Sequence, residues 1–268
     1  MRPLAALFAL VVVVVVAAVV AVALTRHDAG AHGDTRQPVA AALRCATPAH
    51  PNPVVLVPGT FEATSWISIA DALSADGYCV KSFQYPQAGT GPIAQSAADL
   101  GGFIDRVLQS TGATRVSIVA HSEGGVVARY YARFLGGTAK VADLVALAPP
   151  NHGTTTPLVI PGVLIGCVAC AQQAAGSSLL AKLNAGDGVP GPVNYTVIET
   201  RYDAVVTPYQ SALLHGPANR ITNVVVQDAC PGDLAGHLTL PDDPVAVQWV
   251  EEALAGNGPA NPAFRPQC

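Results

Sequence analysis

The chain has 268 residues, half of them hydrophobic, which is enough to bury the core of one α/β domain. Its 14 basic residues stand against 18 acidic ones, for a formal net charge of −4, and they form no Lys/Arg cluster. A phosphate backbone is bound by such clusters, so nucleic acid is not an expected partner.

Much of the hydrophobic excess lies at the start of the chain, where residues 4–24 form an uninterrupted apolar run behind Arg2. A run of this length could span a bilayer as a helix, and its layout also suits a secretory signal. We expect residues 1–24 to be a signal peptide or a membrane anchor, with membrane contact if they are not removed. The rest of the chain is then secreted or anchored on the outer face of the membrane. Residues 25–52 lack periodicity and are expected to be a linker.

The remaining residues, 53–268, alternate between predicted strands and helices. The predicted elements are strand 53–57, helix 64–77, strand 78–85, helix 93–112, strand 116–120, a helix after Gly125, strand 141–150, strand 194–200, strand 221–228 and helix 243–256. About 40 residues without clear strands follow position 150. Strands separated by helices of this length pair in parallel, and apolar runs suit strands that are buried on both faces. The sequence predicts an α/β fold with a mostly parallel sheet of about six strands and helices on both faces.

The stretch VSIVAHSEGGVVARYY, residues 116–131, holds a candidate nucleophile, Ser122. An apolar run, residues 116–120, is followed by the small and polar residues 121–125, and after these the apolar residues have helical spacing. This pattern is typical of a nucleophile elbow, a strained turn that presents a serine at the end of a sheet. The alternative interpretation is a buried strand that turns sharply into a helix, since the pattern alone is short.

A serine needs a base, and in a parallel sheet the functional residues lie on loops beyond the carboxyl ends of the strands. His237 follows the last strand and lies on such a loop. His121 adjoins Ser122 and is expected to point elsewhere, and His215 precedes a strand, at the wrong edge. His152 suits a hydrogen bond that fixes its loop at least as well. Three further histidines lie in the N-terminal arm. We therefore predict that His237 is the base.

The base needs an acid that orients its ring. Asp203 follows strand 194–200 by three residues, at the correct edge. Asp228 and Asp233 lie at the same edge but close to His237 in sequence, and they remain the alternatives. Glu199 lies within a strand and is expected to point into a face of the sheet. Asp187, in a Gly-Asp-Gly stretch, is assigned to a turn. The predicted triad, Ser122, Asp203 and His237, has the chain order of an α/β-hydrolase.

Two backbone amides are expected to form an oxyanion hole. One belongs to Glu123, after the nucleophile, and the other to Thr60 in the loop after the first strand, whose hydroxyl could add a further donor. Phe61 and Trp66, just beyond Thr60, are candidates for lining a substrate groove. The apolar segment 154–184 either lines the core or forms an acyl-chain groove or partial lid.

Six cysteines follow the N-terminal segment, an even number that suits disulfides in an oxidising compartment. Six cysteines permit fifteen pairings, and sequence alone does not choose among them. Proximity favours Cys167 with Cys170, and the final residue, Cys268, could hold the tail to Cys230. The Cys-x-x-Cys pair lacks the second ligand pair of a metal site, so no metal is expected.

Several longer motifs together resemble those of the secreted actinomycete lipases, small α/β-hydrolases of the class 2 lipase family that are related to the compact bacillary lipases. They are PVVLVPGT, AHSEGGVVARYYARFLGG, KVADLVALAPPNHGTT, GSSLLAKLN, YTVIETRYDAVVTPY and VVVQDACPGDLAGH. The resemblance implies ester hydrolysis through Ser122, Asp203 and His237, without a cofactor. It also implies the disulfides Cys45–Cys79, Cys167–Cys170 and Cys230–Cys268. VPGT is similar to a loop of a yeast lipase in which a threonine serves the oxyanion.

The chain departs from its relatives at a few positions. Ala120 replaces the first glycine of the general Gly-x-Ser-x-Gly motif, as it does in the bacillary lipases. Glu123 stands where the actinomycete lipases more often have glutamine, and a carboxylate there could repel the developing anion or shift the pH profile. We expect an esterase or lipase whose partner is a lipid or another ester. The alternatives are a cell-envelope acyltransferase with the same triad and a non-catalytic binding protein on the same fold.

Overall fold

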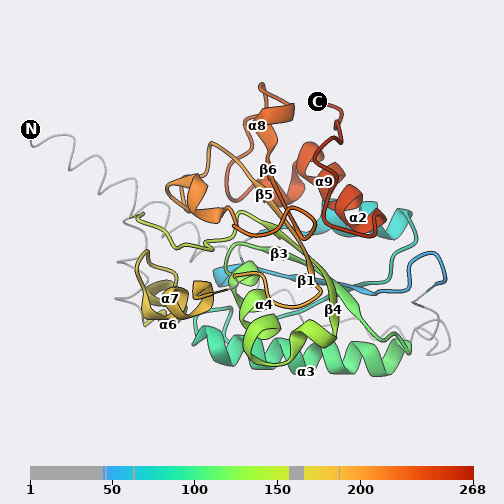
Figure 1. Cartoon of the computed structure of the whole chain (residues 1–268), viewed down its shortest axis with the longest axis horizontal. Coiled ribbons are helices and arrows are strands. Elements are labelled where there is room, and N and C mark those ends of the chain that lie inside the picture. Colours follow the sequence, from blue (N-terminus) through green and yellow to red (C-terminus); the bar gives the residue numbers. More distant parts are fainter. Residues whose placement is uncertain (1–44, 46, 63, 157–165, 187) are drawn as a thin grey trace, which may run out of the picture. The chain divides into compact units, whose positions relative to one another are not determined.

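One six-stranded sheet organises the computed structural model, which describes residues 45, 47–62, 64–156, 166–186 and 188–268 (Figure 1). Its strands are β1 (Val54–Val57), β2 (Val80–Ser82), β3 (Val116–His121), β4 (Val141–Leu147), β5 (Asn194–Glu199) and β6 (Ile221–Val225). They lie in the order β2-β1-β3-β4-β5-β6, and all neighbours are parallel. The prediction of a mostly parallel sheet of about six strands is therefore confirmed.

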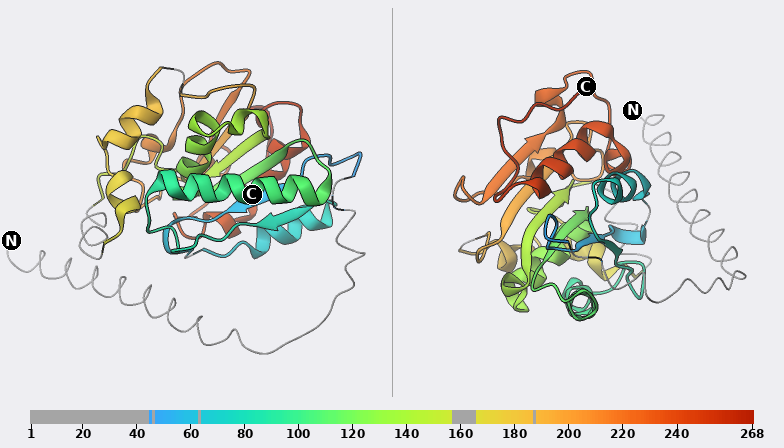
Figure 2. Two further views of the ribbon diagram at one scale, coloured as in Figure 1. Left: turned by 90° about the horizontal axis from the view of Figure 1, so that it is seen from below. Right: turned by 90° about the vertical axis from the view of Figure 1, so that its right-hand side faces the viewer.

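Helices cover both faces of the sheet (Figure 2). Helices α3 (Ile93–Thr111) and α4 (Glu123–Phe134) pack on one face, and α2 (Ile67–Ala75) and α9 (Pro244–Ala255) pack on the other. In β1 the side chains alternate between the two cores, and all four are fully buried. This double burial is why the strands read as continuous apolar runs in the sequence.

The ends of the helices follow local signals in the sequence. Helix α3 stops before Gly112, which adopts a left-handed conformation with φ 73° that glycine accepts without a steric penalty. Helix α9 begins after Asp243, whose carboxylate accepts hydrogen bonds from the amides of Val245 and Ala246.

Two predicted strands are shorter than expected. β2 covers only residues 80–82 of the predicted strand 78–85. The predicted strand 221–228 ends at Val225, and a short helix, α8 (Val226–Ala229), follows. Within α8, the side chain of Gln227 turns inward and bonds the hydroxyl of Thr200 (2.9 Å) and the amide of Arg201 (2.9 Å). Because Gln227 makes these polar contacts, β6 ends at Val225 and the chain continues as α8.

The stretch after β4 contains two short helices, α6 (Val168–Gln172) and α7 (Ser178–Asn184), and no strand among its described residues. The described residues also form four 3-10 turns: η2 (Thr60–Glu62), η3 (Gly137–Ala139), η4 (Tyr209–Ala212) and η5 (Leu240–Asp242).

Three disulfides join Cys45 to Cys79, Cys167 to Cys170 and Cys230 to Cys268, the pairs that the family resemblance implies. The described residues belong to one compact unit, Leu43–Cys268. The proposed signal or anchor, most of the proposed linker and residues 157–165 of the apolar segment lie outside the described residues. Within the described part of the chain, no helix is long and apolar enough to cross a membrane.

Candidate active site

Ser122 lies in a strained turn between β3 and α4. Its φ and ψ are 54° and −124°, values that cost a non-glycine residue about 1–3 kcal/mol. The turn presses against the end of β1, where a Cβ at Gly124 would lie 2.4 Å from the carbonyl oxygen of Val57. Glycine at position 124 therefore lets the elbow approach the neighbouring strand, as the predicted nucleophile elbow requires.

The loops after β5 and β6 bring two further side chains to Ser122. The Nε2 atom of His237 lies 3.0 Å from the hydroxyl oxygen of Ser122, and its Nδ1 atom lies 2.7 Å from Oδ2 of Asp203. The other carboxylate oxygen of Asp203 accepts hydrogen bonds from the amides of Val205 and Val206, both at 2.7 Å. The three residues selected by position in the sequence thus meet in a single chain of hydrogen bonds, and all three are buried.

His121 supports this arrangement, a role that the sequence did not indicate. Its Nε2–H donates to the backbone carbonyl of His237 at 2.9 Å, because a carbonyl oxygen can only accept. Its Nδ1 atom lies 3.4 Å from the hydroxyl of Thr64. Burial, with a smaller contribution from His237, holds the pKa of His121 well below its ordinary value. A neutral His121 therefore fixes the backbone of the loop that carries His237.

Glu199 is a second buried acid close to Asp203, at the end of β5. Its side chain is fully buried, and its Oε1 atom accepts a hydrogen bond from the amide of Thr200 at 2.7 Å. Burial and then the negative charge of Asp203 raise the pKa of Glu199. A second negative charge this close to Asp203 is unfavourable, so the raised pKa favours the protonated form of Glu199.

The side chains considered as alternatives have other partners. Asp228 forms an exposed ion pair with Arg201, and Asp233 accepts a hydrogen bond from the amide of Ala235 at 2.8 Å. The rings of His152 and His215 lie beside each other, 5.9 Å apart between centroids. Asp187 lies outside the described residues.

The predicted oxyanion residues are in direct contact. The hydroxyl of Thr60 donates a hydrogen bond to Oε2 of Glu123, and the amide nitrogen of Gln173 donates to the same oxygen at 3.1 Å. The loop is pressed onto the elbow, since a Cβ at Gly59 would lie 2.9 Å from Cβ of Ser122. Glu123 is the first residue of α4, and the first backbone N–H groups of a helix have no hydrogen-bond partner within that helix. Its backbone N–H is therefore suited to meet an anion beside Ser122.

Phe61 and Trp66 lie in different places. Phe61 packs against the core that contains α3 and α4, whereas Trp66 packs against the core on the other face and meets His121 edge-on at 6.5 Å between ring centroids. They do not share one core, and their role as a substrate groove stays a prediction. Residues 157–165 of the apolar segment 154–184 lie outside the described residues, and the interpretation of the segment as a groove or lid stays a prediction. Its described residues Cys167, Ala169, Leu180 and Leu183 line the core, as the other interpretation expects.

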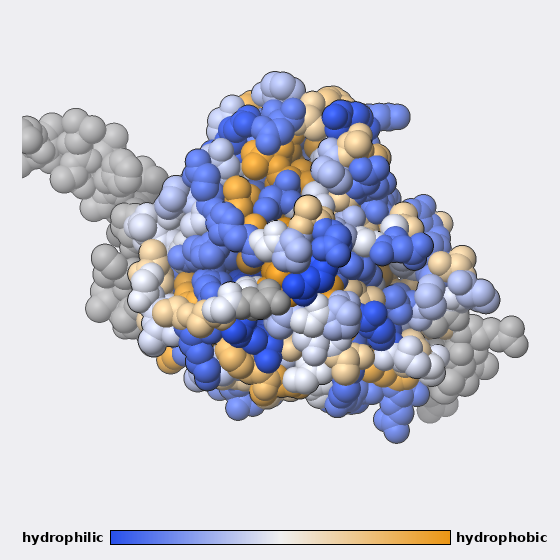
Figure 3. Space-filling model, in the orientation of Figure 1, coloured by the Kyte–Doolittle hydropathy of each residue, from blue (hydrophilic) through white to orange (hydrophobic). Residues whose placement is uncertain are grey.

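Three exposed apolar side chains lie close in sequence to members of the candidate triad. Tyr202 adjoins Asp203, and Leu234 and Leu238 lie on either side of His237 in the sequence; their exposed fractions are 51%, 75% and 48%. On the face drawn in Figure 3, hydrophobic areas interrupt the hydrophilic surface.

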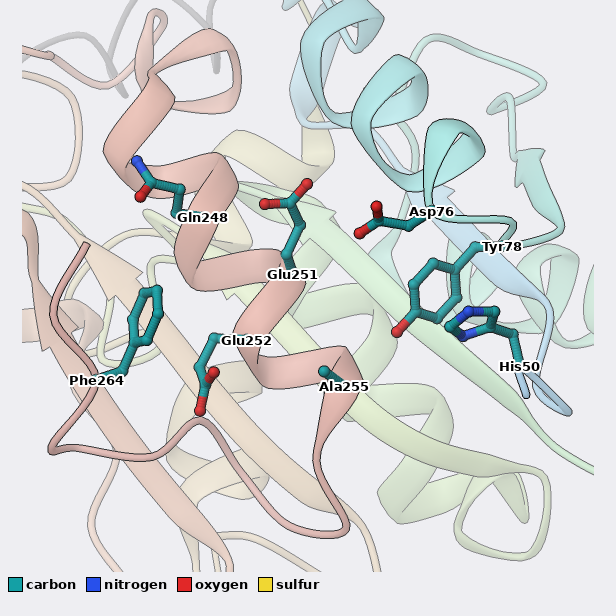
Figure 4. A pocket seen from close by; sticks show the side chains of 8 residues that line it. All are labelled: His50, Asp76, Tyr78, Gln248, Glu251, Glu252, Ala255 and Phe264. Carbon is teal, nitrogen blue, oxygen red and sulfur yellow. The ribbon is translucent and has the colours of Figure 1, made fainter. Parts of the chain in front are cut away.

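A separate hollow of about 450 Å³ lies at the opposite edge of the sheet (Figure 4). Its lining includes His50 and Tyr78, which precede β1 and β2, together with the acids Asp76, Glu251 and Glu252. Burial, and then the charge of Asp76, raise the pKa of Glu251. Because the triad lies at the carboxyl ends of the strands, this hollow is a different site.

A model of the family described as lipase (class 2) matches residues 51–250, a range that contains Ser122, Asp203 and His237. The chain belongs to the class 2 lipase family. The fold of this class 2 lipase is similar to that of Aspergillus fumigatus lipase B, with 22% identity and a TM-score of 0.70 over 87% of this chain and 61% of that one. It is also similar to Bacillus licheniformis lipase BlEst2 in its mature form, with 16% identity and a TM-score of 0.55 over 68% and 86% of the two chains. The class 2 lipase thus spans about three fifths of the Aspergillus enzyme, and these similarities establish the α/β-hydrolase fold.

Proposed function

We propose that this class 2 lipase hydrolyses carboxylic esters of lipids through an acyl-enzyme on Ser122. The observation that carries the proposal is the hydrogen-bond chain from the Ser122 hydroxyl to His237 (3.0 Å) and on to Asp203 (2.7 Å). Both distances lie within the range that proton transfer and ring orientation require.

The hydrogen bonds also assign the protons of the triad. An ionised carboxylate can only accept, so Nδ1 of His237 carries the proton that faces Asp203. The lone pair of Nε2 then faces the hydroxyl of Ser122 and can take its proton. The carboxylate of Asp203, held by two backbone amides, stabilises the imidazolium that results.

The reaction proceeds in two halves. The Ser122 oxygen attacks the ester carbonyl as His237 takes its proton, and the amides of Thr60 and Glu123 hold the oxyanion. The tetrahedral intermediate collapses, the C–O bond to the alcohol breaks, and His237 returns the proton to the departing alcohol. Water then gives a proton to His237 and attacks the carbonyl carbon of the acyl-enzyme. The second tetrahedral intermediate collapses, the bond between the Ser122 oxygen and the acyl group breaks, and His237 returns its proton to Ser122 as the carboxylic acid leaves.

The match to the class 2 lipase family over residues 51–250 supports a lipid-like ester as the substrate. The three disulfides support an oxidising compartment. Together with the apolar run at residues 4–24, they support secretion or attachment to the outer face of the membrane.

The test is hydrolysis of p-nitrophenyl esters, from acetate to palmitate, by the purified protein and its Ser122→Ala variant. We expect the parent to hydrolyse the series and the variant to lose activity by about 10⁴-fold or more. Ser110 is an exposed serine at the far end of α3. Ser110→Ala is therefore the matched control and should retain the parent rate. Activity that survives in Ser122→Ala would overturn the proposal. A folded parent that transfers acyl groups to an added alcohol but not to water would make it an acyltransferase.

A further inference from the structure

Glu123 places a fully buried carboxyl group beside the residue proposed to hold the oxyanion. Its Oε2 atom accepts hydrogen bonds from the hydroxyl of Thr60 and from Nε2 of Gln173, and both of these partners are neutral. Its Oε1 atom is buried without a hydrogen-bond partner among the described residues. The amide of Gln173 is held in its orientation, because Nε2 also donates to the carbonyl of Ala169 at 3.2 Å.

The surroundings of Glu123 favour its neutral form. Tyr85 lies close by and donates its hydroxyl hydrogen to the carbonyl of Pro58, and a second acid, Glu62, accepts the backbone amide of Tyr85. Two histidines also lie on this side: His237 beyond Ser122, and His121, whose Nδ1 atom would lie 3.3 Å from a Cβ at Gly59. Burial raises the pKa of Glu123 to about 8, although the hydrogen bonds from Thr60 and Gln173 lower it.

The hydroxyl of Thr60 has one hydrogen, and the proton on Glu123 decides where that hydrogen points. An ionised Glu123 can only accept, so it takes the Thr60 hydrogen for itself. A neutral Glu123 can donate its own proton to the Thr60 oxygen, which leaves the Thr60 hydrogen free to turn toward another acceptor. The Nε2 atom of Gln173 lies 3.3 Å from the hydroxyl oxygen of Thr60 and can donate a hydrogen bond to it in either protonation state of Glu123.

We propose that Glu123 is a positioning residue, whose neutral form releases the Thr60 hydroxyl to donate a third hydrogen bond to the oxyanion. The inference rests on the proposed function, in which the Thr60 loop and the amide of Glu123 receive that oxyanion. Ionisation of Glu123 withdraws this donor and also sets a negative charge beside the developing anion. Both effects weaken stabilisation of the transition state, whereas binding of the neutral ester is little changed.

The test is the pH dependence of kcat and KM for p-nitrophenyl butyrate between about pH 6 and pH 10, with the spontaneous rate subtracted. We expect the parent kcat to fall by tenfold or more, toward about 10²-fold, as the pH rises through about 8, with KM nearly constant. Glu123→Gln is neutral at every pH and should lose this decline. Glu62→Gln, which removes a neighbouring acid whose carboxylate accepts a hydrogen bond from the amide of Tyr85, is the matched control and should keep it.

Thr60→Val gives a second, independent readout, because it removes the hydroxyl and keeps the backbone amide. We expect at least a tenfold lower kcat at neutral pH and a shallower alkaline decline. An unchanged kcat in Thr60→Val, or a decline that persists in folded Glu123→Gln, would overturn this inference. If Ser122→Ala is inactive at the same time, the proposed function stands without it. If Ser122→Ala is active, the proposed function itself fails.

Discussion

Two glutamate side chains, Glu123 and Glu199, are fully buried next to the proposed triad. The surroundings of the acids in this site differ, and so do the protonation states that they favour. Asp203 accepts three hydrogen bonds, which suit a carboxylate. Glu199, beside it, has one oxygen on the amide of Thr200 and a pKa raised first by burial and then by the charge of Asp203. Glu199 therefore favours its neutral form beside the acid that faces His237.

The buried proton of Glu199 makes stability depend on pH. Because folding raises the pKa of Glu199, the unfolded chain loses this proton near the ordinary value of about 4.3, while the folded protein keeps it. Stability from this group is thus fully present at low pH and falls as the pH rises, by up to about 1.4 kcal/mol per pH unit. Glu199→Gln has no proton to lose. We expect its free energy of unfolding to vary less between about pH 5 and pH 8, and to exceed that of the parent at the upper end.

Urea denaturation of the two proteins across this pH range measures the difference. Asp71→Asn, an exposed acid on α2, is the control and should follow the parent curve. Parallel curves for the parent and Glu199→Gln would show that Glu199 is ionised in the folded protein.

Position in the sequence was sufficient to select Ser122, Asp203 and His237, because parallel strands bring the loops after β3, β5 and β6 to one edge. It was not sufficient for His121 or Gln173. His121 supports the carbonyl of a residue 116 positions away, and Gln173 reaches a carboxyl group 50 positions away. Such contacts depend on side-chain directions that no spacing rule encodes. The catalytic roles themselves stay a proposal until Ser122→Ala is measured.

At the scale of elements, the stretch after β4 was the hardest to predict. Helices α6 and α7 have five and seven residues, too few for a helical period to be recognised. One signal was present: Ser177 caps α7, and its hydroxyl accepts the amide hydrogen of Leu180. The end of β6 was also missed, because Val226 continues the β-branched run while Gln227 turns inward to polar partners.

Arg129 on α4 holds this irregular stretch to the sheet. Its side chain is buried and donates to the side-chain oxygens of Asn151 (3.0 Å) and Asn184 (2.9 Å) and to the carbonyl of Gly188 (2.8 Å). Burial lowers its pKa to about 10, so it stays charged at neutral pH. One side chain thus connects the loop after β4, the end of α7 and the turn before β5.

We expect Arg129→Met to lower the free energy of unfolding by about 3 kcal/mol, because three buried acceptors lose their charged donor. Urea denaturation measures the loss. Arg106→Met, an exposed arginine on α3, is the control and should change the stability by less than about 0.5 kcal/mol. A loss in Arg129→Met no larger than that of the control would contradict the proposed role of Arg129.

At the scale of the whole described unit, the two edges of the sheet carry different features. Its carboxyl edge carries the proposed triad on the loops after β3, β5 and β6, while its amino edge carries the disulfide Cys45–Cys79 next to β2 and the acidic hollow. The disulfide Cys230–Cys268 holds the C-terminal tail to the residue after α8, at the start of the loop that leads to His237. None of the three disulfides joins members of the proposed triad, which are connected by hydrogen bonds.

The three disulfides should contribute unequally, because the entropy that a link removes from the unfolded chain grows with the length of the loop it closes. Cys230–Cys268 spans 38 positions and Cys167–Cys170 spans three, which correspond to about 4 and about 1.6 kcal/mol. We expect the double variant Cys230→Ala/Cys268→Ala to lose more than twice the stability lost by Cys167→Ala/Cys170→Ala in urea denaturation. Ester hydrolysis by the folded Cys167→Ala/Cys170→Ala variant should remain within a few-fold of the parent. Equal losses in the two double variants would mean that local packing around each link, rather than loop length, sets its contribution.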